Sequence, residues 1–143
     1  MDAANRLDLK IRLRADPQKL FKCLTADGER EKYWAEKSVE LDGKIFFTFP
    51  NGITIHSRII TTIPPRIFEI EYFDSLVRFE IFPLPENGCI LELINERIPD
   101  QEWSEQYAGW VSVLMSLKAY VDFGVDLRNH HPEYTWDQMF IDN

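Results

Sequence analysis

Cysteine is scarce in this sequence, and long apolar runs are absent. Its two cysteines, Cys23 and Cys89, lie far apart and outside any Cys-x-x-Cys arrangement, so we expect buried, reduced thiols. No stretch approaches the roughly 18 uninterrupted apolar residues of a membrane-spanning helix. Residues 1–19 also lack the apolar run of a signal peptide. These absences predict a cytoplasmic protein with no membrane span.

Positive charge is also in short supply. The chain has 16 lysines and arginines against 24 aspartates and glutamates, which gives a formal net charge of −8. The isoelectric point is about 4.9. A surface with this balance repels phosphate backbones, and no basic stripe in the sequence overrides that effect. Nucleic acid is therefore not expected as a partner.

The motifs of several enzyme classes are missing as well. The sequence has no Gly-x-Ser-x-Gly elbow, no phosphate-binding glycine loop and no His-Glu-x-x-His. His130 and His131 are adjacent on a short polar turn and point in divergent directions, which favours solvated side chains over metal ligands. We predict no catalytic residue, no metal site and no cofactor.

The length of 143 residues fits one domain. A chain of this size buries on the order of 70% of its unfolded surface, enough for a sizeable core. We expect a single domain over residues 1–143, with its core at about 6–125 and a tail at 126–143. The tail keeps four large apolar residues, namely Trp136, Met139, Phe140 and Ile141. A free tail seldom carries so many, so we expect it to pack on the domain or on a partner chain, which would make a homodimer through the tail.

The first hundred residues predict a strand, two short helices and six more strands. Residues 6–14 alternate apolar and polar side chains, which is typical of a half-buried strand. Asp16-Pro17 reads as a helix start, and Asp27 as the cap of a second helix that ends near Trp34. Residues 37–97 read as six strands separated by turn signals, namely Asp42-Gly43, Asn51-Gly52, Pro64-Pro65, Asp74-Ser75 and Glu86-Asn87-Gly88.

Residues 101–128 have a different periodicity. Large apolar residues recur at steps of three and four, namely Trp103, Tyr107, Trp110, Leu114, Leu117, Val121 and Val125. Ser112, Ser116 and Ala119 lie opposite. The pattern predicts an amphipathic helix from about 101 to at least 122 whose apolar stripe faces a sheet. The whole order indicates an α+β helix-grip fold, in which a seven-stranded, curved antiparallel sheet surrounds a long C-terminal helix.

Turn lengths set the expected register of the strands. Two-residue turns at Pro64-Pro65 and Asp74-Ser75 predict these cross-strand neighbours: Arg58 and Glu71, Glu71 and Arg78, Glu69 and Glu80, Ile70 and Phe79, Tyr72 and Val77. In this register the glutamates face solvent, which favours a structural role over catalysis. The length of one turn is not decided by the sequence. A three-residue turn at Pro50–Gly52 puts Ile45, Phe47 and Phe49 inward, whereas a two-residue turn puts Phe46 and Thr48 inward.

Three stretches together resemble a known family. They are ADPQKLFKCLTADGEREKYWAE, TTIPPRIFEIEYF and GWVSVLMSLKAYVDFG, and the likeness covers residues 6–125. The sequence resembles stand-alone domains similar to the C-terminal domain of the activator of heat-shock protein 90 ATPase. They belong to the START-like superfamily, which includes the birch pollen allergen. Two residues depart from the pattern, since Phe21 replaces a common Trp and a single Gly43 replaces two glycines.

The resemblance implies a cavity between the sheet and the long helix. Members of the superfamily are hydrophobic-ligand carriers, co-chaperones or polyketide cyclase-like enzymes. Residues expected to face this space are Trp34, Phe47, Ser57, Ile70, Tyr72, Phe79, Tyr107, Trp110 and Leu114, and they either line a pocket or fill a core. We predict binding of a small hydrophobic molecule such as a lipid. The alternatives are a co-chaperone-like interaction module for the stress response and a cyclase- or hydrolase-like enzyme.

Overall fold

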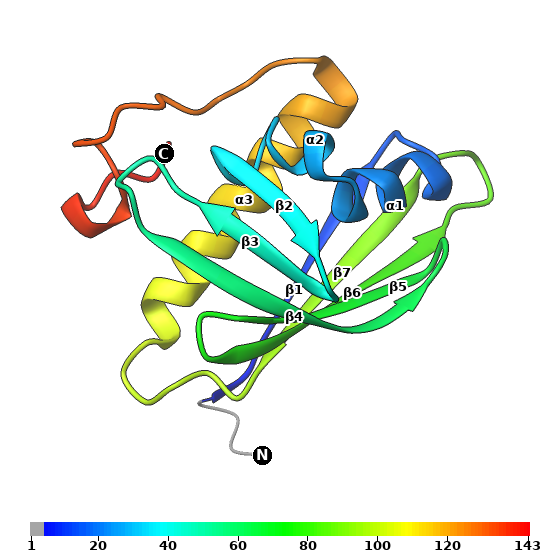
Figure 1. Cartoon of the computed structure of the whole chain (residues 1–143). Helices are drawn as coiled ribbons and strands as arrows, with labels where there is room; N and C mark the ends of the chain where they lie inside the picture. The colour runs from blue at the N-terminus through cyan, green and yellow to red at the C-terminus, as the bar shows by residue number, and fades with distance from the viewer. Residues whose placement is uncertain (1–4) are drawn as a thin grey trace.

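The computed structural model describes residues 5–143 of the chain. A seven-stranded antiparallel sheet, in the order β1-β7-β6-β5-β4-β3-β2, curves around α3 (Figure 1). The elements are β1 (Leu7–Leu13), α1 (Pro17–Thr25), α2 (Asp27–Arg30), β2 (Lys37–Leu41), β3 (Lys44–Thr48), β4 (Thr54–Ile63), β5 (Ile67–Tyr72), β6 (Ser75–Pro83), β7 (Cys89–Glu96), α3 (Trp103–Phe123) and the short 3-10 helix η2 (Trp136–Gln138). This is the predicted α+β helix-grip fold.

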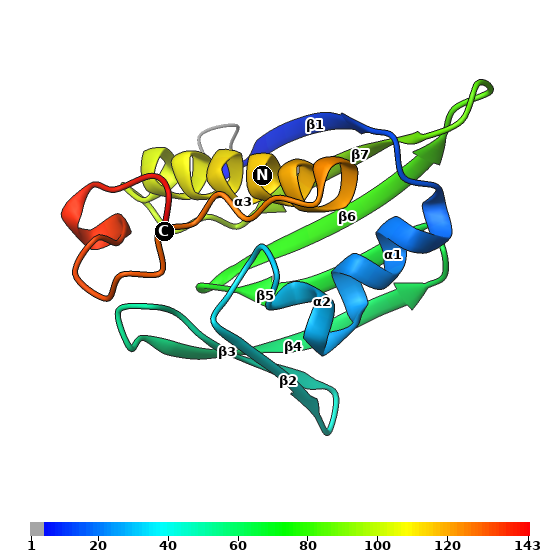
Figure 2. The ribbon, with the colours of Figure 1, turned by 90° about the horizontal axis from the view of Figure 1, so that it is seen from above.

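The two short helices form largely as predicted. The Asp16 side chain caps α1, and Pro17 occupies the first helical position, where a missing N–H costs nothing. α2 ends at Arg30, and hydrogen-bonded turns continue to Trp34, whose N–H donates to the Arg30 carbonyl at 2.8 Å. Asp27 is the first residue of α2 rather than its cap. Figure 2 shows α1 and α2 on the same side of the curved sheet as α3.

The predicted register of the β5–β6 hairpin is wrong by two residues. Tyr72 pairs with Ser75, so the turn is Phe73-Asp74, and both turn residues have a positive φ, 46° and 59°. This is the backbone of a two-residue hairpin turn. The observed pairs are Glu71–Leu76, Ile70–Val77, Glu69–Arg78, Phe68–Phe79 and Ile67–Glu80. A shift of two keeps the same side chains inward, and it places Glu69 opposite Arg78, while Glu80 lies opposite Glu92 on β7.

The predicted pairing of Arg58 with Glu71 is confirmed, although it arises differently. The connection from Ile63 to Ile67 has three residues instead of two, and an irregularity within residues 59–61 restores the register. Arg58 Nε donates to Glu71 Oε1 at 3.1 Å on the exposed face of the sheet. The extra residue in the connection and the irregularity in β4 each shift the register by one residue, and the two shifts cancel.

Between β3 and β4, the three-residue alternative forms. The Phe49 N–H closes the turn over Pro50–Gly52 by donating a 2.9 Å hydrogen bond to the Ile53 carbonyl. Ile45, Phe47 and Phe49 are buried, whereas Phe46 is exposed. An odd number of turn residues selects this parity.

The inner face of α3 is rotated relative to the predicted stripe. Trp110 and Leu114 are buried as predicted, but Trp103 and Tyr107 are exposed by 38% and 39%. Ser116, predicted on the outer face, is buried. α3 carries apolar residues on nearly every side, so residue spacing alone does not select one face. Within residues 5–143, no helix is long and apolar enough to span a membrane.

Candidate ligand-binding pocket

An aromatic cluster fills much of the space between α3 and the sheet. The centroid of the Trp34 ring lies 4.9 Å from that of Phe47, 5.7 Å from that of Tyr72, and 5.8 Å from those of both Phe79 and Trp110. Three of these four contacts are edge-to-face, a favoured geometry for aromatic pairs. This part of the predicted cavity is therefore packed core, made of side chains predicted to line it.

The polar atoms of the cluster bond to one another. Trp34 Nε1 donates to the Tyr72 hydroxyl at 3.0 Å, and Trp110 Nε1 donates to Asn95 Oδ1 at 3.0 Å. Asn95 Nδ2 in turn donates to Ser75 Oγ at 2.9 Å. Burial raises the pKa of Tyr72, so its hydroxyl stays protonated over a wider pH range than that of an exposed tyrosine. These internal bonds orient both indoles without a ligand.

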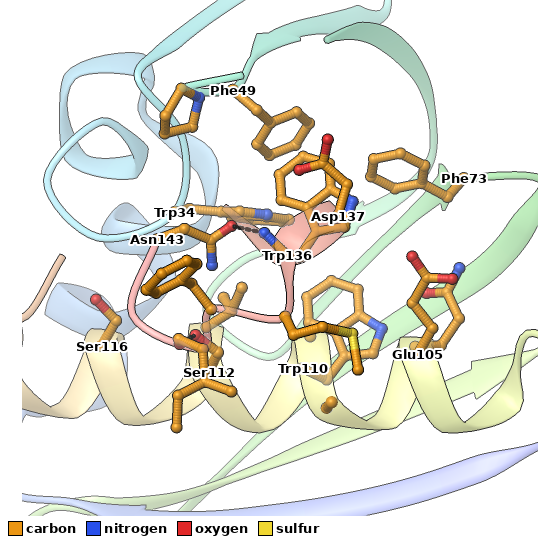
Figure 3. A pocket seen from close by; sticks show the side chains of 18 of the residues that line it. Trp34, Phe49, Phe73, Glu105, Trp110, Ser112, Ser116, Trp136, Asp137 and Asn143 are labelled. Carbon is orange, nitrogen blue, oxygen red and sulfur yellow. Dashed lines mark hydrogen bonds between the residues drawn. The ribbon is translucent and has the colours of Figure 1, made fainter. Parts of the chain in front are cut away.

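A pocket of about 640 Å³ remains beside this cluster. The first two thirds of α3, the β3–β4 and β5–β6 turns and the tail border it, and it is partly open to solvent (Figure 3). Its aromatic lining consists of Tyr33, Trp34, Phe49, Tyr72, Phe73, Trp110, Trp136 and Phe140. The volume is within the common range for small-molecule sites, about 300–1,000 Å³, and an aromatic lining is typical of such sites.

The predicted site residues divide into three groups. Three line the pocket, namely Trp34, Tyr72 and Trp110. Five are buried in the core outside its lining, namely Phe47, Ser57, Ile70, Phe79 and Leu114. The expectation that Tyr107 faces the sheet is wrong, because its ring is exposed and stacks on Trp103 with a centroid distance of 5.1 Å. A role of these residues in binding stays a prediction.

Sequence reasoning assigned no residue of the hairpin turns or of the tail to the pocket, although one turn alternative put Phe49 inward and Trp136 was expected to pack. Phe49 and Phe73 come from two turns, and the Trp136 ring from the tail lies 5.2 Å and 6.3 Å from them, close to perpendicular to both. The apolar content of the tail was the one signal for its contribution. No local pattern indicates which part of the fold a tail will contact.

Arg128 holds the start of the tail. Its guanidinium donates two hydrogen bonds to the Asp126 carboxylate and one each to the carbonyls of Ala35, at 3.0 Å, and Glu31, at 2.8 Å. Farther along, Ser112 on α3 donates to a carbonyl of the tail. The tail therefore bridges the segment after α2 and the outer side of the pocket.

His130 adds a second link between the tail and the domain. Its Nδ1 lies 2.9 Å from both carboxylate oxygens of Glu36, and its Nε2 lies 2.7 Å from Asp126. The bond to Glu36 raises the pKa of His130; partial burial opposes this, and the bond to Asp126 adds to it. Burial tends to raise the pKa of Asp126, but hydrogen bonds from Arg128 and His130 outweigh it and lower that pKa to about 2. Among residues 5–143 no cluster of three or more His, Cys, Asp or Glu side chains could hold a metal ion.

Two buried hydroxyls have no hydrogen-bond partner among the described residues, those of Ser57 and Ser116. Ser57 belongs to β4 in the core, whereas Ser116 lies on α3 in the pocket wall. In Figure 3, Ser116 stands at the opposite end of this stretch of α3 from Glu105. A buried, unpaired hydroxyl costs about 1–3 kcal/mol, so a hydrogen-bond partner for the Ser116 hydroxyl, which is closed to solvent in this structure, would be favourable.

No family model and no curated protein matches this sequence. Its fold is similar to that of protein SSP2350 from Staphylococcus saprophyticus, with a TM-score of 0.75 and 15% identity over 86% of this chain and 96% of that one. The Aha1 dimer from Colwellia psychrerythraea has a TM-score of 0.74 and 19% identity over 83% and 97%. EF2215 from Enterococcus faecalis, a conserved protein of unknown function, has a TM-score of 0.73 and 17% identity over 82% and 71%.

These similarities place the chain among helix-grip α+β proteins that share one fold with bacterial conserved proteins and with an Aha1 protein. At identities under 20% they establish the fold alone. Membership in the activator family, the cyclase- or hydrolase-like alternative and the cytoplasmic location stay predictions.

Proposed function

We propose that the protein binds a small, mainly hydrophobic molecule in the pocket between α3, the two hairpin turns and the tail. The observation that carries this proposal is an aromatic-lined space of about 640 Å³ whose wall includes Ser116, a residue with a buried, unpartnered hydroxyl. Small-molecule sites commonly combine an apolar wall with a few fixed polar groups that orient the ligand. The wall supplies affinity, and Ser116 supplies orientation.

Gly109 on α3 provides a position at which the proposal can be tested. It lines the pocket, and a Cβ added there would meet no atom within 4 Å. A glycine inside a helix is about 1 kcal/mol less favourable than alanine. Gly109 is exposed, so a side chain added at this position would extend into open space without meeting packed atoms.

Filling the space at Gly109 tests the proposal without disturbing the core. We expect Gly109→Phe to fold and to lose binding of apolar probes, because the ring occupies the pocket. Gly109→Ala should keep binding and gain about 1 kcal/mol in the free energy of unfolding. Binding is measured by tryptophan fluorescence and by the rise in melting temperature with a panel of fatty acids, sterols, flavonoids and alkyl amphiphiles.

Two results would contradict the proposal. One is equal probe binding by the wild type and by Gly109→Phe, which would place the binding elsewhere. The other is the absence of any thermal or fluorescence change across the panel. A loss of binding with an unfolded Gly109→Phe is recognised by circular dichroism, and Gly109→Leu then replaces it as the filling variant.

Self-association is a second candidate function, favoured by the exposed apolar stripe on α3. Trp103, Tyr107, Val111 and Met115 follow one another at steps of four and are all at least 38% exposed. Met139 in the tail is exposed as well. Contiguous exposed apolar surface of this kind is typical of interaction sites. We propose a second copy of the chain as the occupant, in line with the dimeric state of the similar Colwellia protein.

A charge in the stripe tests self-association. Val111→Glu should shift the sedimentation coefficient from that of a dimer to that of a monomer, because a buried unpaired carboxylate opposes association. Val39→Glu on β2 is the matched control, since Val39 is an exposed valine outside the stripe, and it should stay dimeric. A wild-type protein that sediments as a monomer at every concentration would refute the dimer.

A further inference from the structure

The charged side chains that line the pocket are mainly acidic. They comprise three carboxylates and one guanidinium, namely Glu102, Glu105, Asp137 and Arg128. The Arg128 side chain is only 5% exposed and already donates to Asp126 and to two backbone carbonyls. It has little capacity left for an anionic ligand. The lining therefore presents negative charge with no available cation.

The carboxylates share the pocket lining with aromatic rings. Figure 3 shows Glu105 on α3 on the same side of the view as Phe73, while Asp137 from the tail lies between Phe49 and Phe73. The Asp137 carboxylate accepts hydrogen bonds from Thr135 Oγ1 and from the Asn51 side chain, which hold it in place. Aromatic faces and carboxylates both attract ammonium groups, and they do so together in sites for quaternary amines.

Ser116 marks the other end of the ligand. It lies eleven positions from Glu105 along α3, which corresponds to roughly 16 Å at the helical rise per residue. Ser116 is part of the pocket wall, and its hydroxyl is buried and unpartnered. The space between these two ends is lined by the Trp110 indole and by Gly109. An elongated apolar body thus fits between a cation-attracting end and a hydrogen-bonding end.

We infer that the ligand is a cationic amphiphile, an amine or quaternary ammonium compound, whose head lies near Glu105 and Asp137 and whose apolar body extends toward Ser116. This inference rests on the proposed function and names its ligand class. Fatty acids and other anionic amphiphiles bind poorly, because their heads meet carboxylates and no free cation. The charges of the lining, rather than its apolar wall, discriminate between cationic and anionic amphiphiles.

Three probes with the same alkyl chain test the inference: decyltrimethylammonium, decyldimethylamine oxide and decyl sulfate, all below the concentration of micelle formation. The first is cationic, the second has no net charge and a similar head size, and the third is anionic. Isothermal titration calorimetry should show the cation binding roughly tenfold more tightly than the sulfate, with the amine oxide between them. The difference should shrink as ionic strength rises.

Variants separate the pocket carboxylates from the net negative charge of the whole protein. The double variant Glu105→Gln/Asp137→Asn should lose most of the preference for the cation and keep its affinity for the amine oxide. The matched control Glu86→Gln/Asp42→Asn removes the same charge from two exposed turn positions outside the pocket. It should keep the preference of the wild type.

The outcomes distinguish this inference from the proposed function. Equal affinities of the three probes for the wild type, or equal preferences in the two double variants, would overturn the cationic ligand and leave the pocket as an apolar site. No binding of any probe, together with a negative result for the wider panel, would overturn both.

Discussion

Trp110→Ala is expected to lower the free energy of unfolding by about 3–5 kcal/mol, the usual cost of removing a fully buried aromatic side chain. The indole is 1% exposed and contacts Trp34, Tyr72 and Phe79. Its removal also leaves Asn95 Oδ1, buried between the sheet and α3, without its donor. A loss of this size consumes much of the roughly 5–15 kcal/mol that stabilises a typical domain. Urea denaturation of both proteins measures it.

The control for this prediction is Trp103→Ala on the same helix. Trp103 is 38% exposed and has one hydrogen bond, from Nε1 to a backbone carbonyl at 2.8 Å. Its removal should cost about 1 kcal/mol, because solvent replaces much of what the indole contacts. Equal losses from the two substitutions would mean that the inner face of α3 is assigned wrongly.

Asp27→Ala is expected to cost about 3 kcal/mol, because it leaves a buried guanidinium without its counter-ion. Arg30 is completely buried and donates to Ser38 Oγ at 2.7 Å, to the Leu24 carbonyl at 3.0 Å and to the Asp27 carboxylate. The value is at the lower end for a broken buried pair, since the Asp27 side chain is 41% exposed. Asp27→Asn should cost less, because the amide oxygen keeps one acceptor for Arg30.

A surface ion pair provides the matched comparison. Arg58 and Glu71 are joined on the outer face of the sheet, and their side chains are 61% and 50% exposed. Glu71→Ala should change the free energy of unfolding by less than about 1 kcal/mol, because water screens the pair and solvates Arg58 when it is alone. If Asp27→Ala costs no more than Glu71→Ala under the same urea titration, the buried guanidinium is not dependent on Asp27.

The strand register shows what the turn residues of the sequence can and cannot predict. Asp74-Ser75 has the composition of a turn, yet the chain turns one residue earlier, at Phe73-Asp74. Composition alone does not distinguish these choices, because both keep Tyr72 and Val77 on the inner face. Core burial penalises a slip of one residue and tolerates a slip of two. The set of inward-facing side chains was therefore predictable here, whereas the cross-strand partner of each residue was not.

The pocket was predictable only in part. Trp34, Tyr72 and Trp110 carried a sequence signal, because each is an inward-facing aromatic residue of its own element. Phe73 sits in a turn, where no alternation predicts the direction of a side chain. Trp136 follows residues without regular structure, so its contact with the β3–β4 turn has no local signature.

The sequence by itself determined the order of strands and helices, the Asp16 cap, and which side chains of β5 and β6 point inward, whereas it left the inward face of β3 undecided. Those features depend on residues close together in the chain, through hydrogen bonds, periodicity and turn chemistry. Only the tertiary structure decided which face of α3 is buried and where the tail lies. α3 has apolar side chains around most of its circumference, and the tail has several surfaces against which its tryptophan could pack. In both cases the outcome depends on contacts between distant segments, whose energies no local pattern contains.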